Sequence, residues 1–387
     1  MSKKLKFQKL HRIAKKDLRD CYHNEGVFAS KINFSDYWAR DTFWASLGMM
    51  AIDDDEQAKK SLALFLKNQR KDGKIPRKIC LDFNLIKYLG IQIPRKKPRP
   101  IFTSPIKLFF SFDDNLLLTI SFCHYIEKTG DFDFAKKYFD QIALAIKFYQ
   151  NKKLIRDSLL NEIGLGNWMD TVFKKGAVLY TNCLWFGALK RFEKLSQEIG
   201  KGQWQFEIKS EKVAEKIQEK FWLESKGYFA DNVCRKKQIP YFDLAGNVLA
   251  IIFGIAKQKQ AEKIILKADS IKKKKDFLHP INHPRYPLWK ISPATFPLGI
   301  ADYQNMNNWS WIEILLILAK FRSGQNKKGL KNLESFSKVV LKLDTICETY
   351  NLNGTPFDHL FWKSARPFAW SAGLLLWVLS EIEREKN

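Results

Sequence analysis

The chain alternates between two kinds of helical segment along most of its 387 residues. Segments of the first kind are apolar almost all round, whereas those of the second kind carry a single apolar stripe. A helix that is apolar on every side must be buried, and an amphipathic helix lies outside it. The apolar segments cover 114–129, 180–195, 244–256, 309–321 and 368–382. The amphipathic segments cover 56–69, 134–149, 207–221, 258–268 and 326–341.

This strict pairing predicts helical hairpins in two concentric layers, with the apolar helices inside. The predicted fold is all-α, an (α/α)6 toroid that forms a single domain over 1–387, with 1–25 as an N-terminal helix or extension. We find no alternation typical of strands. Long irregular segments between the hairpins carry polar motifs, as expected of a scaffold that presents its site at one end. These segments cover 70–111, 151–179, 223–243, 272–308 and 342–367.

The formal net charge of +25 could indicate a nucleic-acid or other polyanionic partner. The lysines are scattered over polar helix faces, with short basic runs at 95–97 and 272–275, and no nucleic-acid motif accompanies them. We therefore expect a solvated basic surface and no nucleic-acid partner. A non-catalytic module that binds a carbohydrate or a polyanion remains an alternative.

Cysteine spacing and hydropathy predict a cytoplasmic protein. The six Cys are dispersed without paired spacing, which is typical of reduced thiols. No apolar region follows the basic N-terminus, so we expect no signal peptide. The longest apolar stretches, 244–256 and 368–379, fall short of the roughly 20 residues of a membrane span, so we expect no membrane partner.

The turn at 166–170 reads Gly-Asn-Trp-Met-Asp and places a carboxylate directly after two large apolar residues. Apolar neighbours remove solvent from a carboxyl group and favour its protonated form, which can cleave a glycosidic bond. Asp170 is therefore a candidate general acid, with Trp168 beside it and Asn182 on the next apolar helix. Alternatively, Asp170 caps a helix that begins near Val172.

A second motif, Trp38-Ala39-Arg40-Asp41, leads into a predicted helix over 42–51. Arg40 supplies a fork of donors and Asp41 an acceptor beside it, a combination suited to adjacent sugar hydroxyls. Trp38 agrees with this interpretation, because the chain holds twelve Trp and several of them lie near polar residues. Alternatively, Asp41 caps the helix.

Two further motifs lie in the C-terminal half of the chain. Residues 303–311 read Tyr-Gln-Asn-Met-Asn-Asn-Trp-Ser-Trp, an amide- and Trp-rich start to a helix that could cap the helix or line a sugar site. Glu348 stands in a turn-rich stretch, where it is either a site carboxylate or a solvated surface residue. The candidate residues of these motifs are Gln304, Asn305, Trp309, Trp311, Glu348 and Trp370.

Metal and phosphate chemistry find no support in the sequence. His279 and His283 are four residues apart, but Pro280 and Pro284 preclude the helix that a His-x-x-x-His metal pair requires. No Gly-rich phosphate loop follows a strand, and no Ser lies in a nucleophile elbow. We therefore expect neither a metal nor a cofactor.

Taken in order, these motifs resemble those of the six-hairpin (α/α)6-barrel glycoside hydrolases, and most closely the amylo-α-1,6-glucosidase domain of glycogen debranching enzymes. The segment 38–41 is similar to the family's Trp-x-Arg-Asp motif, and 167–170 to its Thr-Trp-Met-Asp acid segment. The segment 303–311 is similar to Tyr-x-Asn-Gly-x-x-Trp-Pro-Trp, and 348–350 with 369–371 to the closing segment that holds the base. Asn167, Met306 and Ser310 depart from these patterns.

The resemblance implies an inverting hydrolase of α-glucosidic bonds, with Asp170 as general acid and Glu348 as general base. Arg40 and Asp41 would hold the terminal glucose of an α-glucan or small glucoside, and Trp side chains would form the walls. No metal or cofactor is implied, because both carboxylates act by proton transfer. A hydrolase of another small glucoside, such as trehalose, sucrose or glucosyl-glycerate, remains an alternative on the same fold.

Overall fold

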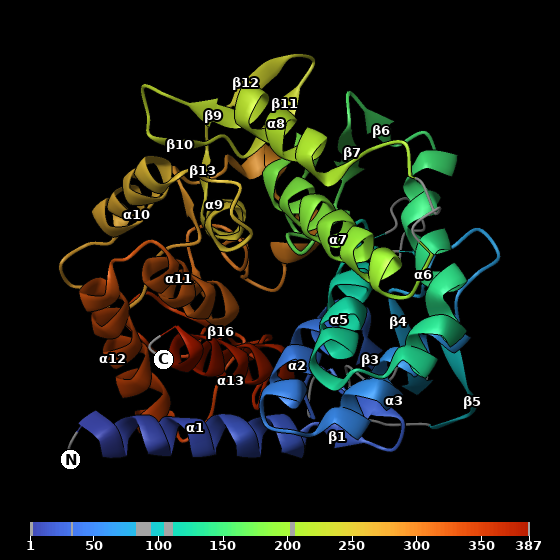
Figure 1. The fold of residues 1–387 in the computed structure, drawn as a ribbon. Helices are drawn as coiled ribbons and strands as arrows, with labels where there is room; N and C mark the ends of the chain where they lie inside the picture. The colour runs from blue at the N-terminus through green and yellow to red at the C-terminus, as the bar shows by residue number, and fades with distance from the viewer. Residues whose placement is uncertain (1–2, 32–33, 83–93, 104–110, 202–205, 386–387) are drawn as a thin grey trace.

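A computed structural model of the chain describes all residues except 1–2, 32–33, 83–93, 104–110, 202–205 and 386–387. Six of the described helices form an inner ring in which each helix packs against the next, and the last packs against the first (Figure 1). In chain order they are α2 (Ala39–Ala51), α5 (Asp114–Thr129), α7 (Leu179–Glu198), α9 (Leu244–Ile252), α11 (Ser310–Arg322) and α13 (Ala369–Arg384). The predicted toroid is confirmed.

An outer layer of amphipathic helices surrounds this ring (Figure 1). Its members are α1 (Lys3–Asp20), α3 (Asp55–Lys67), α6 (Phe132–Asn151), α8 (Ser210–Phe221), α10 (Gln258–Ile271) and α12 (Asn326–Leu343). Five of them follow their inner partners along the chain. The sixth, α1, packs on α12 and α13, so the two ends of the chain together complete the last hairpin.

The ring closes where α2 and α13 meet at two glycines. A Cβ on Gly48 would lie 2.2 Å from the carbonyl oxygen of Gly373, and a Cβ on Gly373 would lie 2.6 Å from the Cα of Ala45. Both obstacles are backbone atoms, which cannot rotate away as a side chain can. Glycine is therefore required here so that the two helices can approach closely.

Short strands occur in the connections, where the sequence predicted irregular structure. The longest sheet runs β12-β11-β8-β7-β6, with antiparallel neighbours. Its strands are β6 (Ile155–Arg156), β7 (Leu159–Gly164), β8 (Lys174–Val178), β11 (Asn232–Cys234) and β12 (Lys237–Ile239). Three of these strands have only two or three residues, and β8 pairs with the distant β11, so local alternation does not reveal the sheet. The prediction of irregular structure is therefore wrong in these connections.

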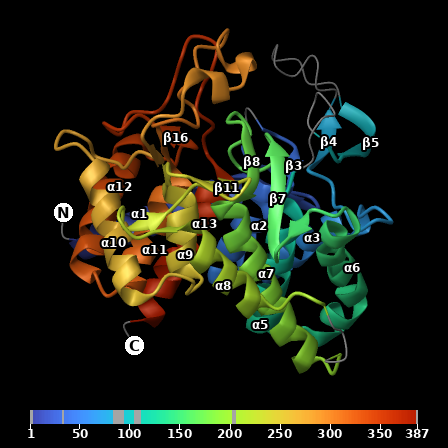
Figure 2. The same cartoon turned by 90° about the horizontal axis from the view of Figure 1, so that it is seen from above.

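A second sheet joins β3 (Tyr37–Trp38), β4 (Lys78–Asp82) and β5 (Pro94–Ile101). Four two-stranded pairs complete the described strands: β1 (Tyr22–His23) with β2 (Gly26–Val27), β9 (Trp222–Leu223) with β10 (Tyr228–Phe229), β13 (Phe242–Asp243) with β14 (Asn282–His283), and β15 (Asn308–Trp309) with β16 (Thr349–Tyr350). Strands β3, β8, β13 and β15 run directly into inner helices. Many of the strands and long loops therefore gather at the end of the ring where inner helices begin (Figure 2).

None of the six Cys forms a disulfide bond, and five of them are buried. Among the described residues we find no helix whose length and apolarity would suit a membrane span.

Candidate functional site

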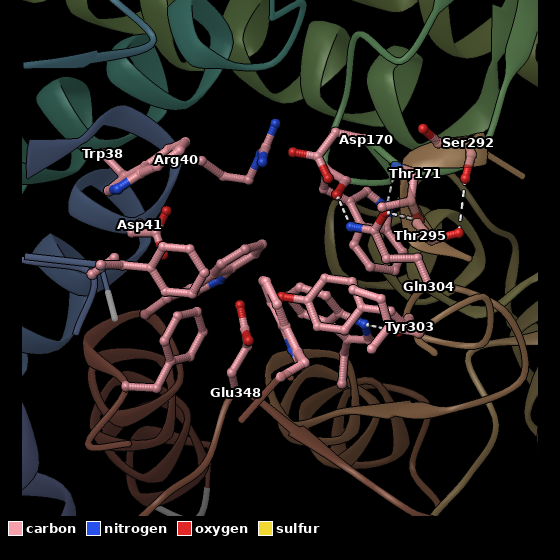
Figure 3. Close-up of a pocket in the computed structure, with 18 of the residues that line it drawn as sticks. Trp38, Arg40, Asp41, Asp170, Thr171, Ser292, Thr295, Tyr303, Gln304 and Glu348 are labelled. Atoms are coloured by element: carbon pink, nitrogen blue, oxygen red, sulfur yellow. Dashed lines mark hydrogen bonds between the residues drawn. The ribbon is translucent and has the colours of Figure 1, made fainter. Parts of the chain in front are cut away.

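A cavity of about 300 Å³ opens among these loops and inner-helix starts. Most of the site residues expected from the sequence line it, and they come from connections and from the first turns of α2 and α13 (Figure 3). These residues are Trp38, Arg40, Asp41, Trp168, Asp170, Gln304, Trp309, Glu348 and Trp370. Motifs more than 300 residues apart in sequence therefore meet at one place.

Arg40 lies in the first turn of α2, where the short strand β3 delivers it to the cavity. Its Nε donates to Asp113 Oδ2 at 2.7 Å, and its Nη2 donates to Oδ1 at 3.1 Å. Asp113 also accepts from the hydroxyls of Tyr180 and Ser111. This bidentate pair fixes the guanidinium plane at the edge of the cavity.

Asp41 does not cap α2, because Trp38 occupies the N-cap position and no side chain caps that helix end. The carboxyl group is buried beside the cavity. Burial raises the pKa of Asp41 to about 7, although the positive charge of Arg40 opposes the rise. The helix-cap alternative is therefore wrong for this residue.

Asp170 lies in the connection between β7 and β8, and no helix begins after it, so the capping alternative is wrong here too. Its Oδ2 accepts from Arg77 Nη2 at 2.9 Å, and 29% of its side chain is exposed. Trp168 and Met169 are buried in the core. The expected removal of solvent by these two neighbours is therefore incomplete, and an ion pair balances the carboxylate.

Two amide side chains hold the Asp170 loop in shape. Gln304 Oε1 accepts from both the backbone N–H and the hydroxyl of Thr171 at 2.7 Å, while its Nε2 donates to the carbonyl of Trp168. Asn167 accepts from the N–H of Met169 and donates to buried Glu162. Gln304 lines the cavity, but its amide bonds the loop on either side of Asp170 and so acts as a positioning group.

Glu348 immediately precedes β16 and is buried, so the alternative of a surface carboxylate is wrong. Burial raises the pKa of Glu348 to about 8. A hydrogen bond from the Tyr303 hydroxyl opposes the rise, and the negative charges of Asp41 and Asp170 add to it. Ser310 donates to the backbone carbonyl of Glu348 and anchors this strand to the start of α11.

The tryptophans pack together at the cavity wall. Trp168 meets Trp309 edge-on at 5.5 Å and Trp311 at 5.1 Å between ring centroids. Trp311 stacks on Trp370 at 4.7 Å and is fully buried behind the cavity wall. Trp311 therefore supports the wall from behind and does not line the cavity.

Asn182 and Asn305 also lie outside the cavity lining. Asn182 binds both the N–H and the carbonyl of Leu160 on β7, and Asn305 binds both backbone groups of Tyr286. Each amide side chain thus satisfies the backbone N–H and carbonyl of one residue, as a neighbouring strand would do. From the sequence alone, a buried amide with this role cannot be distinguished from one that contacts a ligand.

Several groups at this site were not predicted from the sequence. Tyr303 begins one of the sequence motifs, and Asp113 belongs to a buried acidic pair at a helix start, so both carried a local signal. Arg77 carried none, because only the antiparallel pairing of β3 with β4 brings it to Asp170. Phe34 and Trp362, which line the cavity, were missed because their positions also depend on the tertiary fold.

We find no cluster of three or more His, Cys, Asp and Glu side chains suited to a metal ion within the part of the chain that the structure describes. The cavity instead presents three carboxylates, one fixed guanidinium and aromatic walls. Such a surface can exchange protons and hold hydroxyl groups.

A family model described as amylo-alpha-1,6-glucosidase matches residues 103–376. Among solved structures, the chain is similar to GH63 mannosylglycerate hydrolase from Thermus thermophilus, with 14% identity and a TM-score of 0.73, covering 95% of this chain and 99% of that one. A rhamnosidase from Klebsiella oxytoca with rhamnose bound is similar at 12% identity and a TM-score of 0.67, covering 98% and 64%. A glycosidase variant in complex with glucose is similar at 12% identity and a TM-score of 0.65, covering 99% of both chains. No curated protein matches the chain.

At these identities the solved structures establish the shared six-hairpin fold alone. The family match covers well over half of the chain and includes the segments that carry Asp170, Tyr303 and Glu348. The resemblance inferred from the motifs is confirmed: this chain belongs to the amylo-α-1,6-glucosidase family and is a glycoside hydrolase.

Proposed function

We propose that this protein hydrolyses an α-glucosidic bond with inversion, with Asp170 as general acid and Glu348 as general base. The observation that carries the proposal is that these two carboxylates enter one cavity from opposite sides (Figure 3). An inverting hydrolase needs this arrangement, because the acid protonates the leaving oxygen while the base activates a water on the other face of the sugar.

The terminal glucose occupies the space between the two carboxylates. Arg40 is held by Asp113, so its remaining donors can meet sugar hydroxyls, and Asp41 beside it can accept from them. Trp38, Trp168 and Trp309 supply flat apolar walls for the C–H faces of the ring. Trp370 closes the wall on the side of α13.

The reaction needs one proton on the carboxylate pair, located on Asp170 and not on Glu348. In the free protein, burial favours the protonated form of Glu348, and Arg77 pairs with Asp170. We propose that bound glucose shifts the proton of the pair toward Asp170 before bond cleavage.

A panel of α-glucosides tests the proposal, with the configuration of the first product followed by NMR. We expect β-glucose to form first from an α-linked substrate. Asp170→Asn and Glu348→Gln should each lower kcat/KM by about 10²–10⁴-fold, because each removes one proton-transfer group. Asp140→Asn, at a side chain that is 88% exposed, is the matched control. Unchanged activity in both site variants would contradict the assignment.

The cavity volume favours a small glycoside as a second candidate substrate. About 300 Å³ lies at the lower end of the range for ligand sites, which suits one sugar and a short leaving group better than a branched glucan. Trehalose, sucrose and glucosyl-glycerate belong in the panel beside isomaltose and a branched dextrin. Preferred cleavage of the dextrin would support glycogen debranching, whereas preferred cleavage of a disaccharide would support the smaller substrate.

We further propose a cytoplasmic location and no nucleic-acid partner. The lack of disulfide bonds among the six described Cys supports the first proposal, because thiols remain reduced in the cytosol. Lysine ion pairs support the second, since they occur on several separate outer helices, namely α3, α8 and α10. Weak binding to nucleic acid that disappears at physiological salt would agree with such a surface.

A further inference from the structure

The charged groups of the cavity are concentrated around the proposed sugar position. Arg40 and Asp41 lie on one side, and Asp170 and Glu348 face each other across the middle (Figure 3). Because Asp170 protonates the leaving oxygen, the leaving group must lie beside Asp170 and away from Arg40. Thr171, Ser292 and Thr295 occupy that side of the cavity.

On the leaving-group side, backbone hydrogen bonds join the loop that holds Ser292 to the loop that holds Asp170. Ser292 N–H donates to the carbonyl of Thr171, and Phe173 N–H donates to the carbonyl of Lys290. Two of the three hydroxyl donors on this side are already used within the protein, because Thr171 donates to Gln304 and Thr295 donates to the carbonyl of Ser292. The other lining residues here are uncharged and mostly apolar: Phe34, Ala294, Leu298, Ile300 and Trp362.

The rim beyond this side exposes large apolar side chains. Trp289 is 78% exposed, Phe361 is 71% exposed and Leu360 is 84% exposed. They lie on the two loops that line the cavity through Leu298 and Trp362. These loops adjoin, since a Cβ on Gly299 would lie 3.8 Å from His359. Large exposed apolar side chains on loops that also line a cavity are suited to contact a ligand.

The described lining of the cavity disfavours an anionic leaving group. Among the described residues that line the cavity, Arg40 is the single cation, and Asp113 neutralises it. Arg77 nearby is paired with Asp170. A carboxylate on the leaving group would therefore lie near the negative charges of Asp170 and Glu348, and no free cation of this lining would balance it.

We infer that the substrate is a glycoside whose leaving group is an uncharged alcohol with an apolar face, seated between Leu298 and Trp362 and covered by the rim of Trp289, Leu360 and Phe361. This inference rests on the proposed function, because it takes the position of the leaving group from the role of Asp170. It adds that the rim selects the leaving group, whereas Arg40 and Asp41 select the sugar.

The test compares α-glucosides that share glucose and differ in the leaving group: phenol, octanol, glucose (as isomaltose or trehalose), glycerate and fluoride. We expect kcat/KM for the phenyl and octyl glucosides to exceed that for the glycerate glucoside at least tenfold. The disaccharide arms show whether the apolar face belongs to an aryl or alkyl group or to a sugar ring. α-Glucosyl fluoride has no organic leaving group and reports on the sugar site and the carboxylates alone.

Two sets of variants sharpen the comparison. Trp289→Ala combined with Phe361→Ala should raise KM for the phenyl and octyl glucosides at least threefold and leave the fluoride reaction unchanged. Leu266→Ala, at a similarly exposed leucine on α10, is the matched control. Leu298→Arg should raise cleavage of the glycerate glucoside relative to the phenyl glucoside at least tenfold, because it places a cation beside the leaving group.

Different results would contradict the inference about the leaving group and the proposed glycosidase function. Equal or better cleavage of the glycerate glucoside by the unaltered protein, or rim variants that leave KM unchanged, would overturn the inference and leave the glycosidase intact. Failure to cleave every glucoside, including the fluoride, would overturn the proposed function itself.

Discussion

The three carboxylates at the cavity differ in what balances their charge. Asp170 has an Arg77 partner at 2.9 Å, whereas Glu348 is buried and Asp41 is adjacent to an arginine that Asp113 already holds. The pKa of Glu348 rises to about 8 and that of Asp41 to about 7, mainly through burial. Which of these carboxyl groups carries a proton therefore determines which one can act as acid and which as base.

The pH dependence of kcat/KM tests whether the Asp170–Glu348 pair acts with one proton. Burial raises the pKa of Glu348 to about 8, so the pair loses its last proton as pH rises through that value. We therefore expect kcat/KM to fall as pH rises through about 8. Asp41→Asn removes a nearby negative charge, so it should move this fall to lower pH as well as weaken sugar binding.

The measurement is the pH at which kcat/KM changes, and not the maximal value of kcat/KM. Asp140→Asn is the control. A kcat/KM that stays level as pH rises through about 8 would contradict the need for one proton on the pair.

At the scale of elements, the site depends on how closely α2 and α13 approach. Arg40 and Asp41 lie in the first turn of α2, and Trp370 lies in the first turn of α13. The two helices touch at Gly48 and Gly373. The same pair of glycines therefore closes the ring and sets the distance between two walls of the cavity.

Gly48→Ala should destabilise the protein by about 1–3 kcal/mol or more, because the new Cβ meets backbone and the helices must separate. Urea unfolding measures the change, and kcat/KM should fall as well. Gly187→Ala is the matched control on an inner helix, since its Cβ would meet the movable ring of Phe253 at 3.1 Å. Equal stability of the two variants would contradict the close-packing argument.

At the scale of the whole molecule, α1 is part of the barrel and not an appendage. Leu10, Ile13, Ala14 and Leu18 are buried, and α1 packs on α12 and α13. The Asp17 carboxylate accepts from the N–H of Ile346 at 2.6 Å, which ties α1 to the segment leading to Glu348. The first and last parts of the chain thus depend on each other for burial.

Leu18→Ala should lower the free energy of unfolding by about 2–5 kcal/mol, because it opens a cavity in this interface. Leu5→Ala, at a leucine in the same helix that is 45% exposed, is the matched control and should change stability little. Thermal and urea unfolding report both variants. An equal, small effect at the two positions would mean that α1 contributes nothing to the barrel.

The sequence by itself determined most of the helices, their inner or outer places and nine of the residues that line the cavity. Periodicity is a local property, so it predicted α5 at its observed bounds and α12 to within two residues. The motifs around Arg40, Asp170 and Glu348 could be found because each is a short, continuous stretch.

Only the tertiary structure decided which groups face one another. The pairing of Arg77 with Asp170, the support of Trp311 behind the wall and the backbone contacts of Asn182 join segments far apart in the chain. Closure of the sixth hairpin by α1 and α13 is of the same kind. The local sequence pattern predicts whether a residue is buried. Which residue it contacts depends on how the whole ring of helices closes.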